Sequence, residues 1–344
     1  MGQGQAMEKP SSSPQAPSVN RKASASGAVL PELAAFTLSN PSIMDFLISI
    51  LYSASYGGRV LLSFPDKQVV AGNLSFYEDD TPNVSLLQVV LSKVPAVSDM
   101  VSVVVHHEGL VENREVVLKE YLDTIDVLVY PLLVWLTDPH RPGTRLLPDE
   151  ENPSIIKCDS IITLANSPAK EGQFSTIKNS IGRGSMFAFH GSCNGNWHSI
   201  LRTGIRVMSG TEYQTTGTSY GRGVYFGSHS SISHSYCKNR GIAWPNSKFI
   251  NNSATKGSPT SSLIIMALVE LIDHPTEVKV HPCSTGGATT NGDSSNIYVC
   301  DNEALFTIRM LMINPSSDLC CIKMLEACQR IVEKSIKNLD SSSL

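Results

Sequence analysis

The second half of the chain alternates short apolar runs with polar, glycine-containing loops, and this pattern limits the folds open to it. The clearest runs are LIIMALVELI, NIYVC and LFTIRMLMI, and the segments FAFH and YGRGVYF are also typical of strands. Short helices are expected at NWHSILRTG and at SSISHSYC. Strands joined mainly by loops favour antiparallel pairing. The sequence therefore predicts an α+β fold for this half.

The first half differs in composition. Its opening residues are rich in Ser, Pro, Ala and Gly, with almost no apolar side chains, which predicts a flexible tail over residues 1–34. From about Phe36 onward, apolar residues recur at helical spacing. We expect strands at RVLLSF, NLSFYE and MVSVVVHH, and a second helix from about Asn113 to Tyr130 with Pro131 at its end or at a kink. These elements predict a smaller α+β module of unknown role over residues 35–150.

The stretch DPHRPGTRLLPDEENPS contains four prolines and mixed charges, so it predicts a linker or domain boundary near residues 138–154. The strand-rich domain is expected over residues 160–320. A periodic apolar segment near the end predicts a final helix and tail over residues 321–344.

Composition excludes several classes of protein. The formal net charge of -4 gives no field that would favour nucleic acid, and the apolar run Val127 to Leu136 is too short to span a membrane. Eight cysteines without a CxxC pair are typical of reduced thiols, and no Cys/His spacing suggests a metal site. We therefore expect a cytoplasmic or nuclear protein with no bound metal. Nothing in the sequence specifies an oligomeric state.

Common nucleotide and hydrolase signatures are missing: there is no GxGxxG motif, Walker A loop or GxSxG elbow. Glu120 and Asp123 lie one helical turn apart, but such a pair is more typical of a solvated helix face than of a catalytic site. By contrast, the region from Phe187 to Cys237 holds a strand-end His-Gly-Ser, two tyrosines and several glycines. Tyrosine rings, a serine hydroxyl and exposed backbone could together hold a nicotinamide ring and its carboxamide.

The blocks FAFHGS, NWHSILRTGI, YGRGVYF and SISHSYC, in this order and spacing, resemble the catalytic core of the poly(ADP-ribose) polymerases, the diphtheria-toxin-like ADP-ribosyltransferases. The resemblance extends from about Ile162 to Ile313. The blocks ITLANSPAKEGQF and SNIYVC are more similar to the branch that transfers single ADP-ribose units. The resemblance implies NAD+ as substrate, a protein acceptor, and a split β core of two antiparallel sheets.

The resemblance also assigns roles at the end of the FAFHGS strand. His190 would hydrogen-bond a ribose hydroxyl of NAD+, Gly191 would clamp the carboxamide through its backbone, and Ser192 would contact the nucleotide. Arg206, after the first short helix, would lie near the adenosine or pyrophosphate. A strand-end histidine can also be purely structural.

Two tyrosines and a serine complete the expected nicotinamide pocket. Tyr225 and Tyr236 would stack on the ring from both sides, and Ser233 would donate to the carboxamide oxygen. Each tyrosine alone could be a core aromatic residue. The spacing of these three residues matches the family, which favours a binding site.

Asn296 departs from the pattern of the polymer-forming enzymes, which carry a glutamate at this strand position. An amide can orient a ribose by hydrogen bonding but cannot accept a proton as a base, so chain elongation is expected to fail. If the register shifts, the position becomes Ile297 or Tyr298, and neither is acidic. The sequence thus predicts a mono-ADP-ribosyltransferase with His190, Tyr225 and Asn296 as catalytic residues. The alternative is an inactive module that binds NAD+, ADP-ribose or a partner protein.

Overall fold

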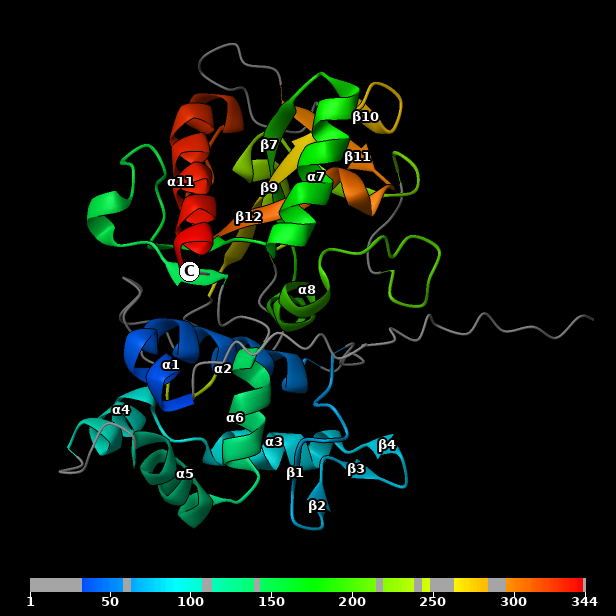
Figure 1. Ribbon diagram of the computed structural model, residues 1–344. Helices are drawn as coiled ribbons and strands as arrows, with labels where there is room; N and C mark the ends of the chain where they lie inside the picture. The colour runs from blue at the N-terminus through cyan, green and yellow to red at the C-terminus, as the bar shows by residue number, and fades with distance from the viewer. Residues whose placement is uncertain are drawn as a thin grey trace, which may run out of the picture. The chain divides into compact units, whose positions relative to one another are not determined.

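The computed structural model describes residues 33–57, 63–106, 113–138, 143–214, 219–237, 243–247, 263–283 and 295–342 (Figure 1). Residues 1–32 of the tail expected over residues 1–34, and most of the expected strand RVLLSF, lie outside the described residues. The prediction is wrong for Leu33 and Ala34, which begin a helix and are buried.

The second half of the chain forms one eight-stranded antiparallel sheet in the order β10-β11-β8-β7-β9-β12-β6-β5. The strands are β5 (Thr144–Leu146), β6 (Ser160–Leu164), β7 (Ser185–Gly191), β8 (Val224–Gly227), β9 (Ile265–Ile272), β10 (Val278–Pro282), β11 (Asn296–Cys300) and β12 (Phe306–Ile313). Only the pair Phe189–Gly227 joins β7 to β8, whereas the neighbouring strands share longer ladders. The sheet is therefore split between β7 and β8, as the expected split β core requires.

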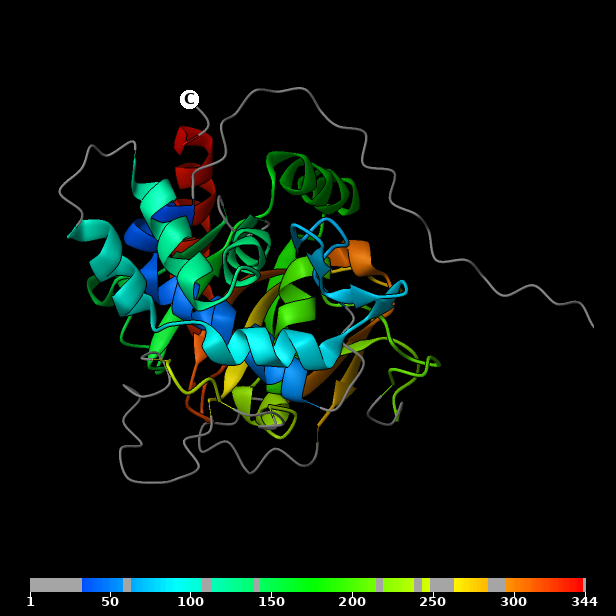
Figure 2. The ribbon, with the colours of Figure 1, turned by 90° about the horizontal axis from the view of Figure 1, so that it is seen from below.

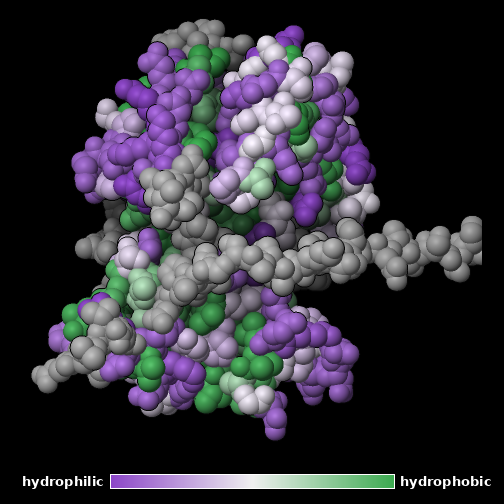
Figure 3. Space-filling model, viewed as in Figure 1, coloured by the Kyte–Doolittle hydropathy of each residue, from purple (hydrophilic) through white to green (hydrophobic). Residues whose placement is uncertain are grey.

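Strand β9 is buried at every position, which explains its continuous apolar sequence. Ala267 and Val269 face one hydrophobic cluster, and Met266 and Leu268 face another on the opposite side of the sheet. Helix α11 (Cys321–Ser342) packs over the second cluster. Hydrophilic residues cover its outward face (Figure 3). The final helix expected from the sequence is confirmed.

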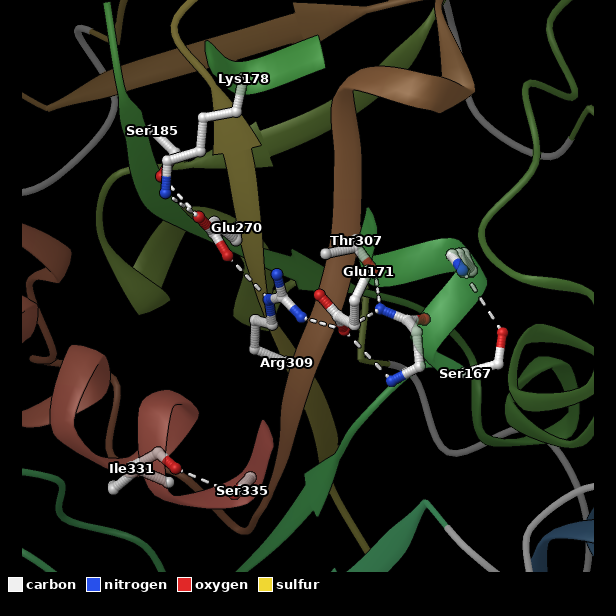
Figure 4. Close-up of polar contacts among 11 residues, drawn as sticks. Ser167, Glu171, Lys178, Ser185, Glu270, Thr307, Arg309, Ile331 and Ser335 are labelled. Carbon is white, nitrogen blue, oxygen red and sulfur yellow. Dashed lines mark hydrogen bonds and ion pairs between the residues drawn. The ribbon is translucent and has the colours of Figure 1, made fainter. Parts of the chain in front are cut away.

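Helix α7 (Pro168–Ile181) covers part of the other face, and buried charges hold it there. Arg309 of β12 is only 4% exposed, and its Nε lies 2.7 Å from Glu270 Oε2 on β9. Its Nη1 lies 2.5 Å from Glu171 Oε1 on α7. Lys178, also on α7, pairs with Glu270 at 2.9 Å (Figure 4). The ladder between β12 and β9 shifts register at Arg309, and such a bulge can redirect a side chain toward its partners.

Burial alone would raise the pKa of Glu270, but Arg309, the Ser185 hydroxyl and Lys178 outweigh it and keep this pKa below its usual value. Glu270 is therefore a buried carboxylate whose charge depends on its partners.

We expect Arg309→Ala to lower the free energy of unfolding by about 3–5 kcal/mol, because it leaves Glu270 charged and buried without its main partner. Arg183→Ala removes a more exposed pair with Asp273 and should cost about 1 kcal/mol or less. Urea unfolding of both variants measures the difference. Equal losses would contradict a central role for the buried network.

Residues 33–138 form what we call the helical layer. Its helices are α1 (Leu33–Ser39), α2 (Pro41–Tyr56), α3 (Val84–Lys93), α4 (Val97–Val105), α5 (Arg114–Ile125) and α6 (Val129–Thr137). Two small hairpins, β1–β2 (Val70–Ala71 and Leu74–Ser75) and β3–β4 (Tyr77–Glu78 and Thr81–Pro82), complete it. Figure 2 shows the layer from below, with α3 running across the front.

Four sequence predictions for this region are wrong in detail. The valine-rich segment MVSVVVHH lies largely in helix α4, because Val97, Met100 and Val104 bury one helical face that outweighs the strand preference of valine. The expected second helix is two helices, α5 and α6. Pro131 lies in the first turn of α6, where a missing N–H costs nothing, and so it neither ends nor kinks a helix.

The expected strand NLSFYE is divided between the two small hairpins. Helices make up most of the region, so it is mainly helical and not the expected α+β module. The expected linker over residues 138–154 contains β5, which pairs with β6 at the edge of the sheet. The sheet thus begins before residue 160. Within the described residues, no single helix is long and apolar enough to cross a membrane, although two sharply bent helix pairs reach that length and composition together.

Candidate active site

The end of β7 presents His190 across the split in the sheet. Its Nδ1 lies 3.0 Å from the Tyr225 carbonyl oxygen on β8. Because a carbonyl only accepts, Nδ1 carries the proton in this arrangement, and Nε2 of the neutral ring remains an acceptor. Burial lowers the pKa of His190 below its usual value, with the hydrogen bond to Tyr225 opposing that shift. The ring is therefore suited to accept a hydrogen bond from a hydroxyl group.

Gly191 is required by close packing at the strand end. A Cβ atom there would lie 2.1 Å from the Ser233 carbonyl oxygen and 2.9 Å from Cys237 Sγ. Ser233 belongs to α9 (Ser230–His234), and its Oγ donates to the Phe189 carbonyl at 2.9 Å. The short helix therefore rests directly on β7. In this structure the Ser233 hydroxyl, expected to donate to a carboxamide, donates to the strand.

The two expected tyrosines differ in their surroundings. Tyr225 Oη donates to the Gly221 carbonyl at 2.7 Å and accepts from Tyr220 N at 3.0 Å. These two hydrogen bonds to the backbone fix the position of the Tyr225 hydroxyl. Tyr236 follows α9 and is 44% exposed. Gly223 precedes β8 with φ 141°, and a Cβ there would approach the Cys300 backbone to 2.8 Å. This glycine lets β8 lie close to β11.

Strand register shows which side chains share a face of the sheet. Tyr298 lies opposite Phe226, and Asn296 is two residues away from Tyr298 on the same strand, so all three point the same way. The Phe226 ring lies 5.8 Å from the His190 ring. His190 and Asn296 thus belong to one face, whereas Tyr225 lies opposite Val299 on the other.

Asn296 is fixed by its backbone and side chain. Its N–H donates to Ser228 Oγ at 2.8 Å, and Ser228 N donates to its carbonyl at 2.9 Å. Burial raises the pKa of Tyr298, and a hydrogen bond from the Asn296 side chain opposes that rise. An amide, which cannot act as a base, therefore lies on the face of the sheet that carries His190.

Arg206 and Ser192 also have protein partners. Arg206 Nη1 lies 2.8 Å from Glu303 Oε2 on the short helix η5 (Glu303–Leu305), and the arginine side chain remains 53% exposed. Ser192 Oγ accepts from Asn196 Nδ2 at 2.9 Å. The exposed guanidinium retains donors for a phosphate or hydroxyl group.

Sequence reasoning missed two aromatic neighbours of this site. Tyr220 stacks on His281 with ring centroids 4.6 Å apart, and its ring lies 6.3 Å from that of Tyr225. Phe226 was also missed as the neighbour of His190, although its place in the YGRGVYF block, one residue after Tyr225, could have indicated it. Among the residues that the structure describes, no three His, Cys, Asp or Glu side chains converge as metal ligands would.

A split antiparallel sheet that brings a strand-end His-Gly pair beside a tyrosine and a short serine-bearing helix defines an ADP-ribosyltransferase fold. Residues 157–285 match the family model of the poly(ADP-ribose) polymerase catalytic domain. Domains of the family use NAD+ as their substrate.

The chain is also similar to curated proteins, two of which are named here. Protein mono-ADP-ribosyltransferase PARP8 of Mus musculus and that of Homo sapiens are each 30% identical over 213 residues, which is 60% of this chain. The match covers only 24% of the length of each relative.

Gly191→Ala should disrupt the site, because the added methyl group collides with the Ser233 carbonyl. We expect NAD+ binding, measured by calorimetry, to be lost. Gly172→Ala, on α7 where nothing lies within 4 Å of the new Cβ, is the control and should raise stability by about 1 kcal/mol. Unchanged NAD+ binding by Gly191→Ala would contradict the packing argument.

The His190 imidazole should titrate below the ordinary histidine value of 6.5 because burial disfavours its charged form. As the pH falls through the ordinary value, the unfolded chain takes up this proton first, so the contribution of His190 to stability decreases with falling pH. NMR titration of the ring protons, assigned by comparison with His190→Gln, measures the pKa. A value at or above 6.5 would contradict the assignment.

Proposed function

We propose that this chain is an NAD+-dependent protein ADP-ribosyltransferase that adds single ADP-ribose units to its acceptor. The observation that carries the proposal is the combination of His190, held with Nε2 free to accept, and Asn296 on the same face of the sheet. Support also comes from the two relatives, whose name describes protein mono-ADP-ribosyltransferases.

In the proposed complex, His190 Nε2 accepts a hydrogen bond from a ribose hydroxyl and the Gly191 backbone holds the carboxamide. Tyr225 and Tyr236 stack on the nicotinamide ring. A small rotation would redirect the Ser233 hydroxyl from Phe189 to the carboxamide. Arg206 and Ser192 bind the adenosine end. These groups mainly orient the substrate, which can account for much of the rate enhancement.

The bond that breaks joins the ribose C1′ to the nicotinamide nitrogen, and its electron pair leaves with nicotinamide. The acceptor atom then bonds to C1′ from an oxocarbenium-like state. A carboxylate acceptor needs no base, whereas a hydroxyl acceptor must lose a proton to solvent or to a neighbouring group. Asn296 orients the ribose but takes no proton. Because an ADP-ribose hydroxyl would be a poor acceptor without a base, elongation stops after one unit.

The second candidate is a module that binds NAD+ or ADP-ribose without transfer. Two observations favour it: the amide at position 296, and the Ser233 hydroxyl already bonded to Phe189. The half-exposed Tyr236 and the Nε2 acceptor of His190 favour a functional pocket instead.

Incubation with NAD+ distinguishes the two candidates. We expect nicotinamide release and mass increments of one ADP-ribose unit per modified site, measured by chromatography and intact mass spectrometry. His190→Ala should reduce release by about 100-fold or more if the ring orients the ribose. His106→Ala, at the exposed end of α4, is the control and should release nicotinamide as the wild type does. Ladders of many units would contradict mono-transfer, and NAD+ binding without release would favour the binding module.

A further inference from the structure

The helical layer and the sheet belong to one compact unit over residues 31–344. Helix α2 lies against η4 (Asn194–Asn196) and α8 (Trp197–Thr203), which directly follow the site strand β7. Trp197 is fully buried in a hydrophobic cluster that also contains α2 residues. The layer therefore packs on the chain segment that leaves the candidate active site.

Specific polar contacts fix α8 to the layer. The Arg202 guanidinium lies 3.9 Å from the centre of the Trp135 ring on α6, and its Nη1 donates to the Trp135 carbonyl at 3.3 Å. His198 Nε2 lies 3.0 Å from the Ser63 carbonyl. We call these contacts the α8 clasp. A guanidinium that both stacks and donates is held in position as well as in orientation.

The α8 clasp is linked to the site through few intermediates. Asn196, just before α8, donates to Ser192 Oγ at 2.9 Å, and Ser192 directly follows the His190-Gly191 pair. Asn194 Nδ2 donates to the Leu263 carbonyl at 2.5 Å, close to the start of β9. A shift of α8 would therefore move the group expected to bind the nucleotide.

A second segment of the site region is held by the same layer. Residues 243–247 follow α9 and Tyr236 in the chain, and Ser247 Oγ donates to the Asp45 carboxylate on α2. Asp45 is only 4% exposed and also accepts from Ser49 Oγ at 3.3 Å. Asn246 Nδ2 donates to the Val94 carbonyl at 2.9 Å. We call these contacts the Asp45 clasp.

We propose that the helical layer positions the NAD+ site by holding the two chain segments that leave it, with Arg202 and Asp45 as positioning residues. This inference rests on the proposed function. Neither residue needs to touch NAD+. The layer acts by keeping Ser192 on one side and the Tyr236 segment on the other at the separation that the dinucleotide requires.

The two clasps affect binding more than chemistry. Ser192 would bind the adenosine end of NAD+, which does not react, and Tyr236 would stack on a ring that is present both before and during bond cleavage. Displacing either residue therefore weakens binding of the substrate and of the transition state alike. Such a change raises KM and leaves kcat nearly unchanged. A residue that served folding alone would lower the fraction of active protein and leave KM unaltered.

The test uses the full chain with Arg202→Ala, Arg202→Lys, Asp45→Ala and Asp45→Asn. We expect KM for NAD+ in nicotinamide release to rise about tenfold in both alanine variants, with kcat within about twofold. Arg202→Lys should resemble Arg202→Ala, because lysine lacks the planar group that stacks on Trp135. Asp45→Asn should retain a KM near that of the wild type, because the amide oxygen still accepts from Ser247.

Lys119→Ala is the matched control, since it breaks an exposed contact with Asp123 within α5, away from both clasps. Thermal unfolding is measured for every variant, and calorimetry with NAD+ replaces KM if no nicotinamide is released. If KM or Kd in the clasp variants equals that of Lys119→Ala, the positioning role is wrong while the proposed function stands. If the wild-type chain does not bind NAD+, both proposals fail.

Discussion

The contact between the end of β7 and α9 is the constraint on which the candidate site depends. The Ser233 carbonyl lies where a side chain on residue 191 would have to be, so the strand can approach the helix only because that residue is glycine. This approach brings Ser233 to Phe189 and sets the position from which Tyr236 leaves the helix. The absence of a side chain at Gly191 thus sets the relative positions of the end of β7, the Ser233 hydroxyl and Tyr236.

The split in the sheet has an equally direct consequence. In a continuous sheet, side chains alternate between the two faces along each strand. By the strand register, Tyr225 on β8 and His190 on β7 would then lie on opposite sides of the sheet. Here β7 and β8 share a single residue pair, and beyond it the His190 ring reaches the Tyr225 backbone. His190 and the backbone of Tyr225 therefore come into contact at this split. A ligand placed there can contact a tyrosine from one face and a histidine from the other.

The sequence predicted the parts of the fold that depend on long apolar runs, such as β9, β12 and the final helix. It did not predict the buried charges within those runs. Glu270 and Arg309 are the single charged residues of LIIMALVELI and LFTIRMLMI, and a lone charge in a buried strand requires a partner. The two lone charges can be read from the sequence, but pairing Glu270 with Arg309 also requires knowing that β9 and β12 are neighbours in the sheet. Helix α4 was missed because a short valine-rich run fits either a strand or a buried helix.

The helical layer could not be assigned a role from sequence because its function lies in contacts between distant segments. Helix α2 is buried at every position from Ile43 to Ser55, so it has no solvent-exposed face over that span. Such a helix is part of a shared core, and removing it would expose apolar surface on the domain that carries the site. The helical layer is therefore an integral part of the domain and not a regulatory domain that could separate from it. Its buried Asp45 shows that it also specifies how one chain segment is oriented, since a carboxylate inside a core is stable only where its partners are in place.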